Sequence, residues 1–139
     1  MMTFFDTNVL IYALCNNIDD KEQQNISVKL FEEAIINKSI VLSELILCEF
    51  AFTSKKLKED EKNIEENLNF LSKFVKNSDA NISKRIVEII NNTKLFNSSF
   101  DIFHLSFAEE KSCKLITFDK GFKKLQSISK IEIVILQTS

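Results

Sequence analysis

The chain of 139 residues carries a formal net charge of −2, with 45% hydrophobic and 27% charged residues. This length fits one domain with a core of its own, and the charge balance argues against a protein that coats nucleic acid through a broad basic field. The single glycine, Gly121, and the absence of proline exclude glycine-rich phosphate loops and argue against all-β sandwiches and barrels, which need many tight turns. We therefore expect one helix-rich domain over residues 1–139.

Apolar patterns predict helices and strands that follow one another along the chain. The predicted elements are a strand at 3–5, a helix at 9–14, a helix at 22–37, a strand at 40–42, a helix at 44–52, a helix that begins within the charged stretch 55–66, a helix around 82–90, a helix at 100–111, and strands at 115–118 and 131–136. Strands separated by helices predict a parallel sheet with right-handed crossovers. The expected fold class is α/β, with a sheet of about four to five strands sandwiched by helices.

Several residues mark where these helices begin or what they bury. Ser43 is placed to cap the helix at 44–52, and Ser98 or Ser99 is placed to cap the helix at 100–111. The buried stripe of the helix after the charged stretch is expected to comprise Ile64, Leu68, Leu71 and Val75. The phenylalanines of this half of the chain are expected in the core, namely Phe50, Phe52, Phe70 and Phe74.

The cysteines and the apolar runs bear on the compartment. Cys15, Cys48 and Cys113 are odd in number and far apart, which predicts buried free thiols in a reducing cytoplasm rather than a zinc knuckle or a disulfide framework. The longest apolar run, residues 9–15, is too short to cross a bilayer. The first residues lack the basic leader of a signal peptide, so we expect a cytoplasmic protein.

Four acidic positions stand out, although each has an ordinary structural explanation. Asp6 follows the first strand and would cap a helix. Asp101 lies in a first helical turn, where the helix dipole favours negative charge. Asp119 belongs to a turn-like stretch before Gly121. Glu49 lies in a helix that is apolar all round, where burial requires a partner such as a lysine or a bound cation.

Taken together, the four acidic residues predict a site. Asp6 and Asp119 follow two different strands, and residues just beyond the carboxyl ends of parallel strands converge on one edge of the sheet. Glu49 and Asp101 lie on helices connected to neighbouring strands. Clustered carboxylates repel one another unless a divalent cation compensates them, and oxygen ligands favour Mg²⁺ or Mn²⁺ over zinc.

The surrounding motifs resemble those of PIN-domain ribonucleases. Residues 5–11 (Phe-Asp-Thr-Asn-Val-Leu-Ile) are similar to the family's first motif, and residues 43–49 to its second, with a capping serine six positions before an acidic residue. Residues 101–103 and 115–122 resemble the third and fourth motifs. The interval of 18 residues from Asp101 to Asp119 also fits the family. Size and motif style look most like the toxin of a type II toxin–antitoxin pair of the VapC kind.

The resemblance implies a Mg²⁺- or Mn²⁺-dependent endoribonuclease that leaves 5′-phosphate and 3′-hydroxyl ends. Asp6, Asp101 and Asp119 would hold the metal and Glu49 would be the fourth acidic group. Two further residues, Asn8 and Thr117, would orient these ligands. The expected partners are an RNA substrate, positioned by a few lysines, and a small antitoxin. The resemblance also implies a homodimer.

One departure from the family pattern concerns the only histidine. Phe103 and His104 stand where the family usually has small residues, and His104 shares a helical face with Asp101. A structural role for His104 is the ordinary interpretation, and contact with substrate or metal is the alternative.

An antitoxin would occupy an apolar groove built partly from the helices after Ser43 and Asp60.

Two other functions remain as alternatives. A phosphatase of the haloacid dehalogenase type also places an aspartate after its first strand, but it needs a second aspartate where this chain has Asn8. A non-catalytic binding module with the same fold would leave the metal site unused. The presence of all four acidic residues argues against that second alternative.

Overall fold

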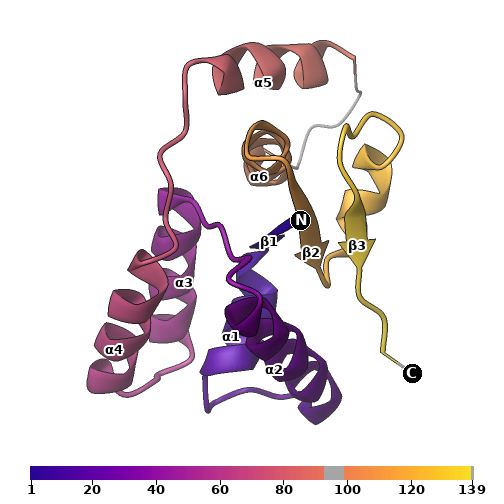
Figure 1. The fold of residues 1–139 in the computed structure, drawn as a ribbon. Helices are drawn as coiled ribbons and strands as arrows, with labels where there is room; N and C mark the ends of the chain where they lie inside the picture. Colours follow the sequence, from indigo (N-terminus) through magenta and orange to yellow (C-terminus); the bar gives the residue numbers. More distant parts are fainter. Residues whose placement is uncertain (93–98, 139) are drawn as a thin grey trace.

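The centre of the fold is a parallel sheet of three strands in the order β1-β2-β3 (Figure 1). The structure is a computed structural model that describes residues 1–92 and 99–138. In chain order the elements are β1 (Met2–Phe5), α1 (Thr7–Leu14), α2 (Lys21–Ile36), α3 (Glu44–Lys56), α4 (Glu61–Ser72), α5 (Asn81–Asn91), α6 (Ser99–Glu110), β2 (Cys113–Thr117), the 3₁₀ helix η1 (Lys120–Leu125) and β3 (Ile133–Ile135). The helix-rich α/β class expected from the sequence is confirmed.

The expected four to five strands are reduced to three among the described residues. The predicted strand at 40–42 forms only single parallel bridges, from Ile40 to Thr3 and from Leu42 to Val75. The two bridges reach different neighbours, so consecutive residues never face the same strand and no ladder develops. The segment continues the sheet beyond β1 without becoming a strand of it.

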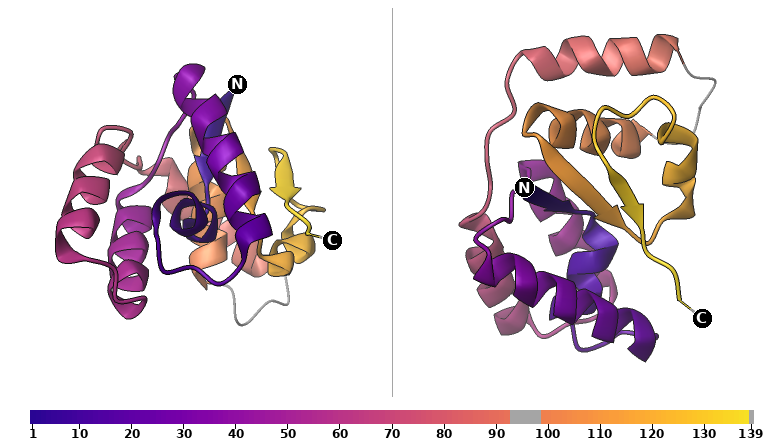
Figure 2. Two further views of the ribbon diagram at one scale, coloured as in Figure 1. Left: turned by 90° about the horizontal axis from the view of Figure 1, so that it is seen from below. Right: turned by 45° about the vertical axis from the view of Figure 1, so that its right-hand side comes forward.

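The helices pack in pairs around the sheet, α1 with α2, α3 with α4, and α5 with α6. Figure 1 and the turned views of Figure 2 place α5 beside α6, away from the pairs formed by the first four helices. Helix α6 also packs against β2, and α1 contacts the same strand. These contacts bring the starts of α1 and α6 toward the end of the sheet where β1 and β2 terminate, and α3 packs against α1.

The charged stretch 55–66 is not the start of one helix, as the sequence suggested. Helix α3 runs on to Lys56, and Lys58 then adopts a left-handed conformation with φ 59°, which is a common way for a helix to end. Asp60 caps α4 by accepting a hydrogen bond from the Asn63 amide. Helix α4 ends at Ser72, so Val75 lies beyond the helix to which we had assigned it.

The core lies between the sheet and the helices. Phe4, Phe5, Leu115 and Ile116 are almost completely buried, as expected for parallel strands covered on both faces. Ser43 caps α3 as predicted, accepting from the Ile46 amide at 3.2 Å. Helix α6 begins at Ser99; the alternative cap, Ser98, lies outside the described residues.

The structure bears on three smaller expectations, two about buried side chains and one about membrane-spanning helices. Cys15 and Cys113 are buried as expected, but Cys48 is exposed, which corrects the prediction that all three thiols are buried. Phe50 is buried and Phe70 and Phe74 pack against the core, whereas Phe52 is 66% exposed. None of the described helices is long and apolar enough to span a membrane.

Candidate metal centre and its pocket

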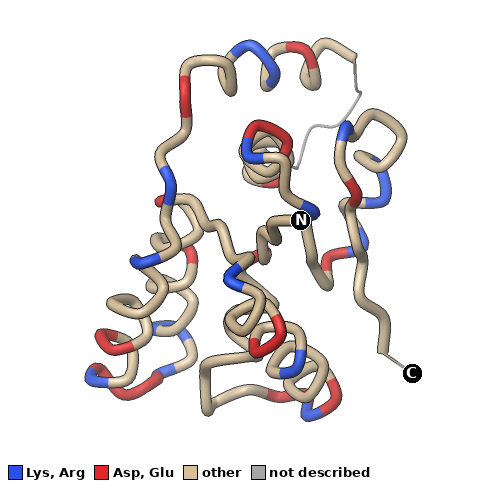
Figure 3. Tube along the Cα trace, in the orientation of Figure 1, with Lys and Arg blue, Asp and Glu red and all other residues tan. Residues whose placement is uncertain are grey.

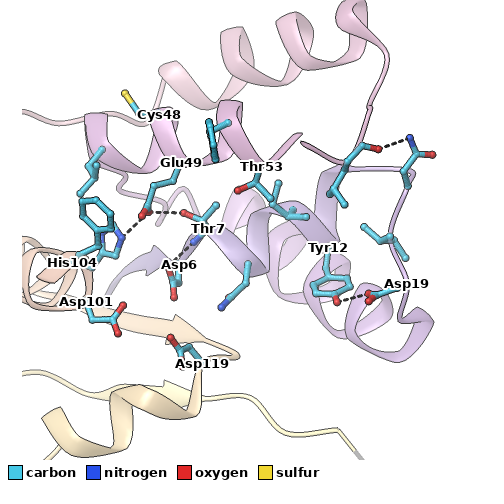
Figure 4. A pocket seen from close by; sticks show the side chains of 18 residues that line it. Asp6, Thr7, Tyr12, Asp19, Cys48, Glu49, Thr53, Asp101, His104 and Asp119 are labelled. Atoms are coloured by element: carbon cyan, nitrogen blue, oxygen red, sulfur yellow. Dashed lines mark hydrogen bonds and ion pairs between the residues drawn. The ribbon is translucent and has the colours of Figure 1, made fainter. Parts of the chain in front are cut away.

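A pocket of about 980 Å³ opens where β1 and β2 end, and all four predicted acidic residues line it. Figure 4 shows Asp6, Glu49, Asp101 and Asp119 around one end of this pocket. They come from four different places in the fold: the end of β1, α3, the first turn of α6 and the turn after β2. The predicted convergence at one edge of the sheet is therefore what the structure has.

Asp6 lies at the floor of the pocket, where only 7% of the residue is exposed. It follows β1 and caps α1, as the sequence predicted. Its Oδ1 accepts from the Thr7 amide at 2.8 Å and its Oδ2 from the Thr117 hydroxyl at 2.7 Å. Burial raises the pKa of Asp6, although the charge of His104 and these two hydrogen bonds oppose the rise. The carboxylate is thus held in a fixed orientation.

Thr117 connects the two strand ends through one fully buried hydroxyl. The hydroxyl donates to Asp6 and accepts from the Asp119 amide at 2.9 Å and from Asn8 Nδ2 at 3.4 Å. The side-chain oxygen of Asn8 in turn accepts from the Phe118 amide at 3.2 Å. Asn8 and Thr117 therefore lie where groups that orient the acidic residues would have to lie.

Glu49 is held by hydrogen-bond partners on α1 and α6, which is one of the alternatives that its burial left open, and not by a lysine. Its Oε1 accepts from the Thr7 hydroxyl at 2.9 Å and lies 2.8 Å from His104 Nε2. Burial alone would raise the pKa of Glu49, but the bonds from His104 and Thr7 outweigh it and hold this pKa below its usual value. Both of these hydrogen bonds end on Oε1, so neither of them occupies Oε2.

His104 lines the pocket, but only 1% of the residue is exposed. An ionised carboxylate only accepts hydrogen bonds, so His104 Nε2 carries the proton that it shares with Glu49. Its Nδ1 is also buried and has no hydrogen-bond partner among the described residues. The ring packs at 5.5 Å from the ring of Phe4. His104 orients Glu49 in this arrangement.

Asp101 and Asp119 complete the acidic end of the pocket (Figure 4). Burial, followed by the charges of Asp119 and Asp6, raises the pKa of Asp101 to about 6. Asp119 is exposed and caps η1, where its Oδ1 accepts from the Gly121 amide at 2.8 Å. Burial is the largest cause of this rise, and the neighbouring carboxylates add to it while the charge of His104 opposes it.

The donor set fits a hard divalent cation. The four acidic side chains offer carboxylate oxygens, the ligands that Mg²⁺ and Mn²⁺ prefer. One ligand atom from each of Asp6, Glu49 and His104 lies within 4.8 Å of the others, a spacing that could hold a metal ion, and Asp101 and Asp119 are not part of this close group. Because His104 Nε2 is paired with Glu49, the carboxylates of Asp6 and Glu49 are the members of the group that are suited to a hard cation. Fixed hydrogen bonds to Asp6 and Glu49 pre-orient these ligands, as groups behind a metal site do.

One wall of the pocket is apolar, which the sequence did not reveal. Helix α3 is not buried all round, because only Ile46, Phe50 and Ser54 are buried in it. Leu45, Cys48 and Phe52 on its other face line the pocket wall together with Phe100 of α6. Helix α4, the other helix expected to build a groove for a partner, contributes none of the residues that line this pocket.

Two further pairs near the pocket also escaped the sequence reading. Tyr12 donates to Asp19 Oδ1 at 2.7 Å at the end of the pocket opposite the acidic cluster (Figure 4). The buried carboxylate of Glu59 accepts from the amides of Asn16 and Asn17 at 2.8 and 2.6 Å and so fixes the loop after α1. These interactions join residues that are close only because loops fold back on the helices. The spacing of residues along the sequence does not predict them.

The chain is similar to known proteins in two respects, its family and its fold. A family model described as PIN domain matches residues 3–127. The sequence has no significant match among curated proteins. The solved structure of VapBC2 from Rickettsia felis, bound to a DNA fragment from its promoter, aligns with a TM-score of 0.73 and 17% identity over 99% of this chain and 100% of that one.

Two other solved structures share the fold at similarly low identity. A toxin–antitoxin complex from Klebsiella pneumoniae aligns with a TM-score of 0.61 and 22% identity, covering 91% of this chain and 92% of that one. VapC20 from Mycobacterium tuberculosis, described as a sarcin–ricin loop cleaving toxin, aligns with a TM-score of 0.62 and 18% identity, covering 87% and 92%. At these identities the likeness concerns the fold.

Proposed function

This chain belongs to the PIN-domain family, and from that premise we propose that it is a metal-dependent endoribonuclease that hydrolyses phosphodiester bonds in RNA. The observation that carries the proposal is the convergence of Asp6, Glu49, Asp101 and Asp119 in one pocket. Family membership removes the haloacid dehalogenase alternative. A related fold in a toxin described as cleaving the sarcin–ricin loop makes single-stranded or loop RNA the substrate class to test first.

In this proposal Asp6, Asp101 and Asp119 hold Mg²⁺ or Mn²⁺, with Glu49 as the fourth acidic group. A divalent cation supplies a Lewis acid that favours ionisation of water and counters the charge that develops on the phosphoryl group. Asp6 is kept in place by Thr117 and Thr7, and Glu49 by Thr7 and His104. Glu49 Oε2 is the atom we assign to accept a proton from the attacking water. The products carry 5′-phosphate and 3′-hydroxyl ends.

Local lysines rather than net charge bring the RNA to the pocket. Lys120, Lys123 and Lys124 are exposed on η1, which begins directly after Asp119. Figure 3 shows positive residues on η1 close to the acidic end of the sheet. Because the chain carries a net charge of −2, contacts to phosphates depend on such local groups, and binding should weaken with added salt.

The experiment is cleavage of an unstructured RNA by the purified protein with Mg²⁺ and with EDTA. The parent should cleave only with the cation, and Asp6→Asn and Asp119→Asn should fall to background while remaining folded. Glu65→Gln, an exposed change on α4, is the matched control. Full activity in both aspartate variants would overturn the assignment. A folded parent that binds RNA without cleaving it would favour the binding-module alternative.

We further propose that the chain is a toxin whose antitoxin docks on the apolar wall of the pocket. The described lining includes five carboxylates and no lysine or arginine, so a basic segment with an apolar face has the complementary charge. Growth arrest on expression in the cytoplasm, relieved by a small co-expressed partner, tests the toxin assignment. Harmless expression of active protein would count against it.

The docking face has its own test. Phe52 is 66% exposed and lines the pocket, so Phe52→Ser should weaken partner binding while leaving the melting temperature unchanged. Val87→Ser on α5 is a matched control, because Val87 is 56% exposed but is not part of the pocket lining. Equal effects of the two substitutions would place the partner elsewhere. A homodimer, also expected within this proposal, is checked by the mass in solution.

A further inference from the structure

The only glycine of the chain is not used for its backbone freedom. Gly121 does not adopt a positive φ, whereas Lys38, Lys58 and Ser112 do, with φ of 52°, 59° and 55°. These are the positions where the left-handed conformation favours glycine, and the sequence fills them with residues that carry side chains. The reason for glycine at position 121 must therefore lie in the space around its Cα atom.

That space belongs to the carboxylate of Asp119. A Cβ atom added to Gly121 would lie 3.0 Å from Asp119 Oδ1, 3.6 Å from its Cγ and 3.7 Å from its Oδ2. The nearest atoms are all from this one side chain. The first distance is closer than carbon and oxygen atoms normally approach, and the group that would have to move is the end of a rotatable side chain. An added methyl group would thus displace this carboxylate oxygen by a few tenths of an ångström and leave the backbone in place.

Gly121 also supplies the bond that fixes this carboxylate. Its amide donates a hydrogen bond to Asp119 Oδ1 at 2.8 Å. The Asp119 backbone is fixed separately, because its own amide donates a hydrogen bond to Thr117 Oγ1 at 2.9 Å. Asp119 is exposed, so packing does little to select its side-chain rotamer. A residue with a Cβ atom at position 121 could keep this hydrogen bond only if its Cβ pressed against Asp119 Oδ1, the oxygen that accepts the bond.

We propose that Gly121 is a positioning residue that keeps the Asp119 carboxylate turned for metal binding by leaving its side-chain space empty. The proposal rests on the proposed function, because it takes Asp119 as a metal ligand. If Gly121 served only as a turn residue, alanine at this compatible backbone conformation would be neutral or stabilising and would leave metal binding unchanged.

The experiment measures Mn²⁺ binding to the RNA-free protein by titration calorimetry. Gly121→Ala should raise the Kd by about tenfold or more, the usual effect of disturbing a group behind a metal ligand. Its melting temperature in EDTA should equal or exceed that of the parent. Ser127→Ala, an exposed and uncharged change two residues after the same 3₁₀ helix, should alter neither quantity.

A double-mutant cycle separates this inference from the function on which it rests. In the Asp119→Asn background, Gly121→Ala should have no further effect on the Kd. If Asp119→Asn binds Mn²⁺ as the parent does, the metal-site assignment itself is wrong. If Asp119→Asn weakens binding and Gly121→Ala does not, the assignment stands and the role of Gly121 is overturned.

A crystal structure of the metal-free Gly121→Ala protein gives a readout that needs no metal. It should show the backbone of residues 119–121 unchanged and the Asp119 carboxylate shifted away from the added Cβ atom. An unmoved carboxylate, or a melting temperature in EDTA below that of the parent, would overturn the proposal.

Discussion

His104 Nε2 lies 2.8 Å from Glu49 Oε1, although the two residues are 55 positions apart in the sequence. The contact joins α6 to α3 at the acidic end of the pocket, and the Thr7 hydroxyl of α1 reaches the same oxygen. Three helices are thus fastened together on one carboxylate oxygen. The orientation of the Glu49 side chain therefore depends on all three helices, and we expect a substitution of His104 to change that orientation before anything else.

Replacing His104 with phenylalanine should reduce Mg²⁺-dependent cleavage by about 10- to 100-fold, because Glu49 loses one of the two groups that orient it. Stability should change by only about 1 kcal/mol, since the lost hydrogen bond is offset by removal of the buried Nδ1 that has no described partner. The decisive comparison is with Glu49→Gln. If His104 acts through Glu49, the double variant is no slower than Glu49→Gln alone; additive losses would give His104 a separate role.

Thr117→Val should destabilise the fold by about 1–3 kcal/mol, because the Asp119 amide and the Asp6 carboxylate lose their common buried partner. Valine has nearly the same shape, so the loss reports on the hydroxyl rather than on packing. Thermal unfolding with and without Mg²⁺ measures it. Thr117→Ser keeps the hydroxyl and is the control; if serine were as damaging as valine, the methyl group would be the important part.

Tyr12 provides a prediction about pH. The hydrogen bond to Asp19, with smaller contributions from burial and the charges of Asp19 and Asp20, raises the pKa of Tyr12 to about 12. The folded value exceeds the unfolded value of about 10, so the stabilisation is present below about pH 10 and is lost as the pH rises toward 12. Asp19→Asn should lower this pKa toward its usual value.

Tyr12 is the only tyrosine of the chain and there is no tryptophan, so ultraviolet absorbance of the phenolate follows this group alone. Asp20→Asn is the matched control, because Asp20 caps α2 and has only a small part in the Tyr12 shift. An unchanged titration in Asp19→Asn would mean that the two side chains are apart in solution.

The sequence was sufficient for the class of fold and for the four acidic residues, because both depend on local rules. Strand, turn and helix in succession place Asp6 and Asp119 at the same edge of a parallel sheet, whatever the details of packing. Ser43 and Asp6 act as caps because a short oxygen-bearing side chain satisfies free amides at a helix start. These inferences need only neighbouring residues.

What the sequence could not supply depends on contacts across the fold. The partner of Glu49 is a histidine on another helix, and no periodicity relates the two. The apolar residues all round α3 predict burial, yet Phe52 and Cys48 line an open pocket. The predicted strand at 40–42 has the apolar residues of a strand but divides its bridges between Thr3 and Val75.

The central claim, that four carboxylates converge to bind a divalent cation, is tested most directly by the thermal unfolding of Asp101→Asn in EDTA and in Mg²⁺. Burial of Asp101, together with the charges of Asp119 and Asp6, raises the pKa of Asp101 to about 6, so without metal we expect removal of this charge to raise the melting temperature above that of the parent. Mg²⁺ should stabilise the parent by binding the folded site, and should stabilise the variant less.

A charge that merely favours a helix start behaves in the opposite way. Neutralising it costs roughly 0.3–1 kcal/mol and leaves the response to Mg²⁺ unchanged. Glu44→Gln, in the first turn of α3 and outside the pocket lining, provides that reference in the same protein. A higher melting temperature of Asp101→Asn in EDTA, with a smaller Mg²⁺ shift, is the result that the clustered site predicts. A lower one with an undiminished Mg²⁺ shift would contradict it.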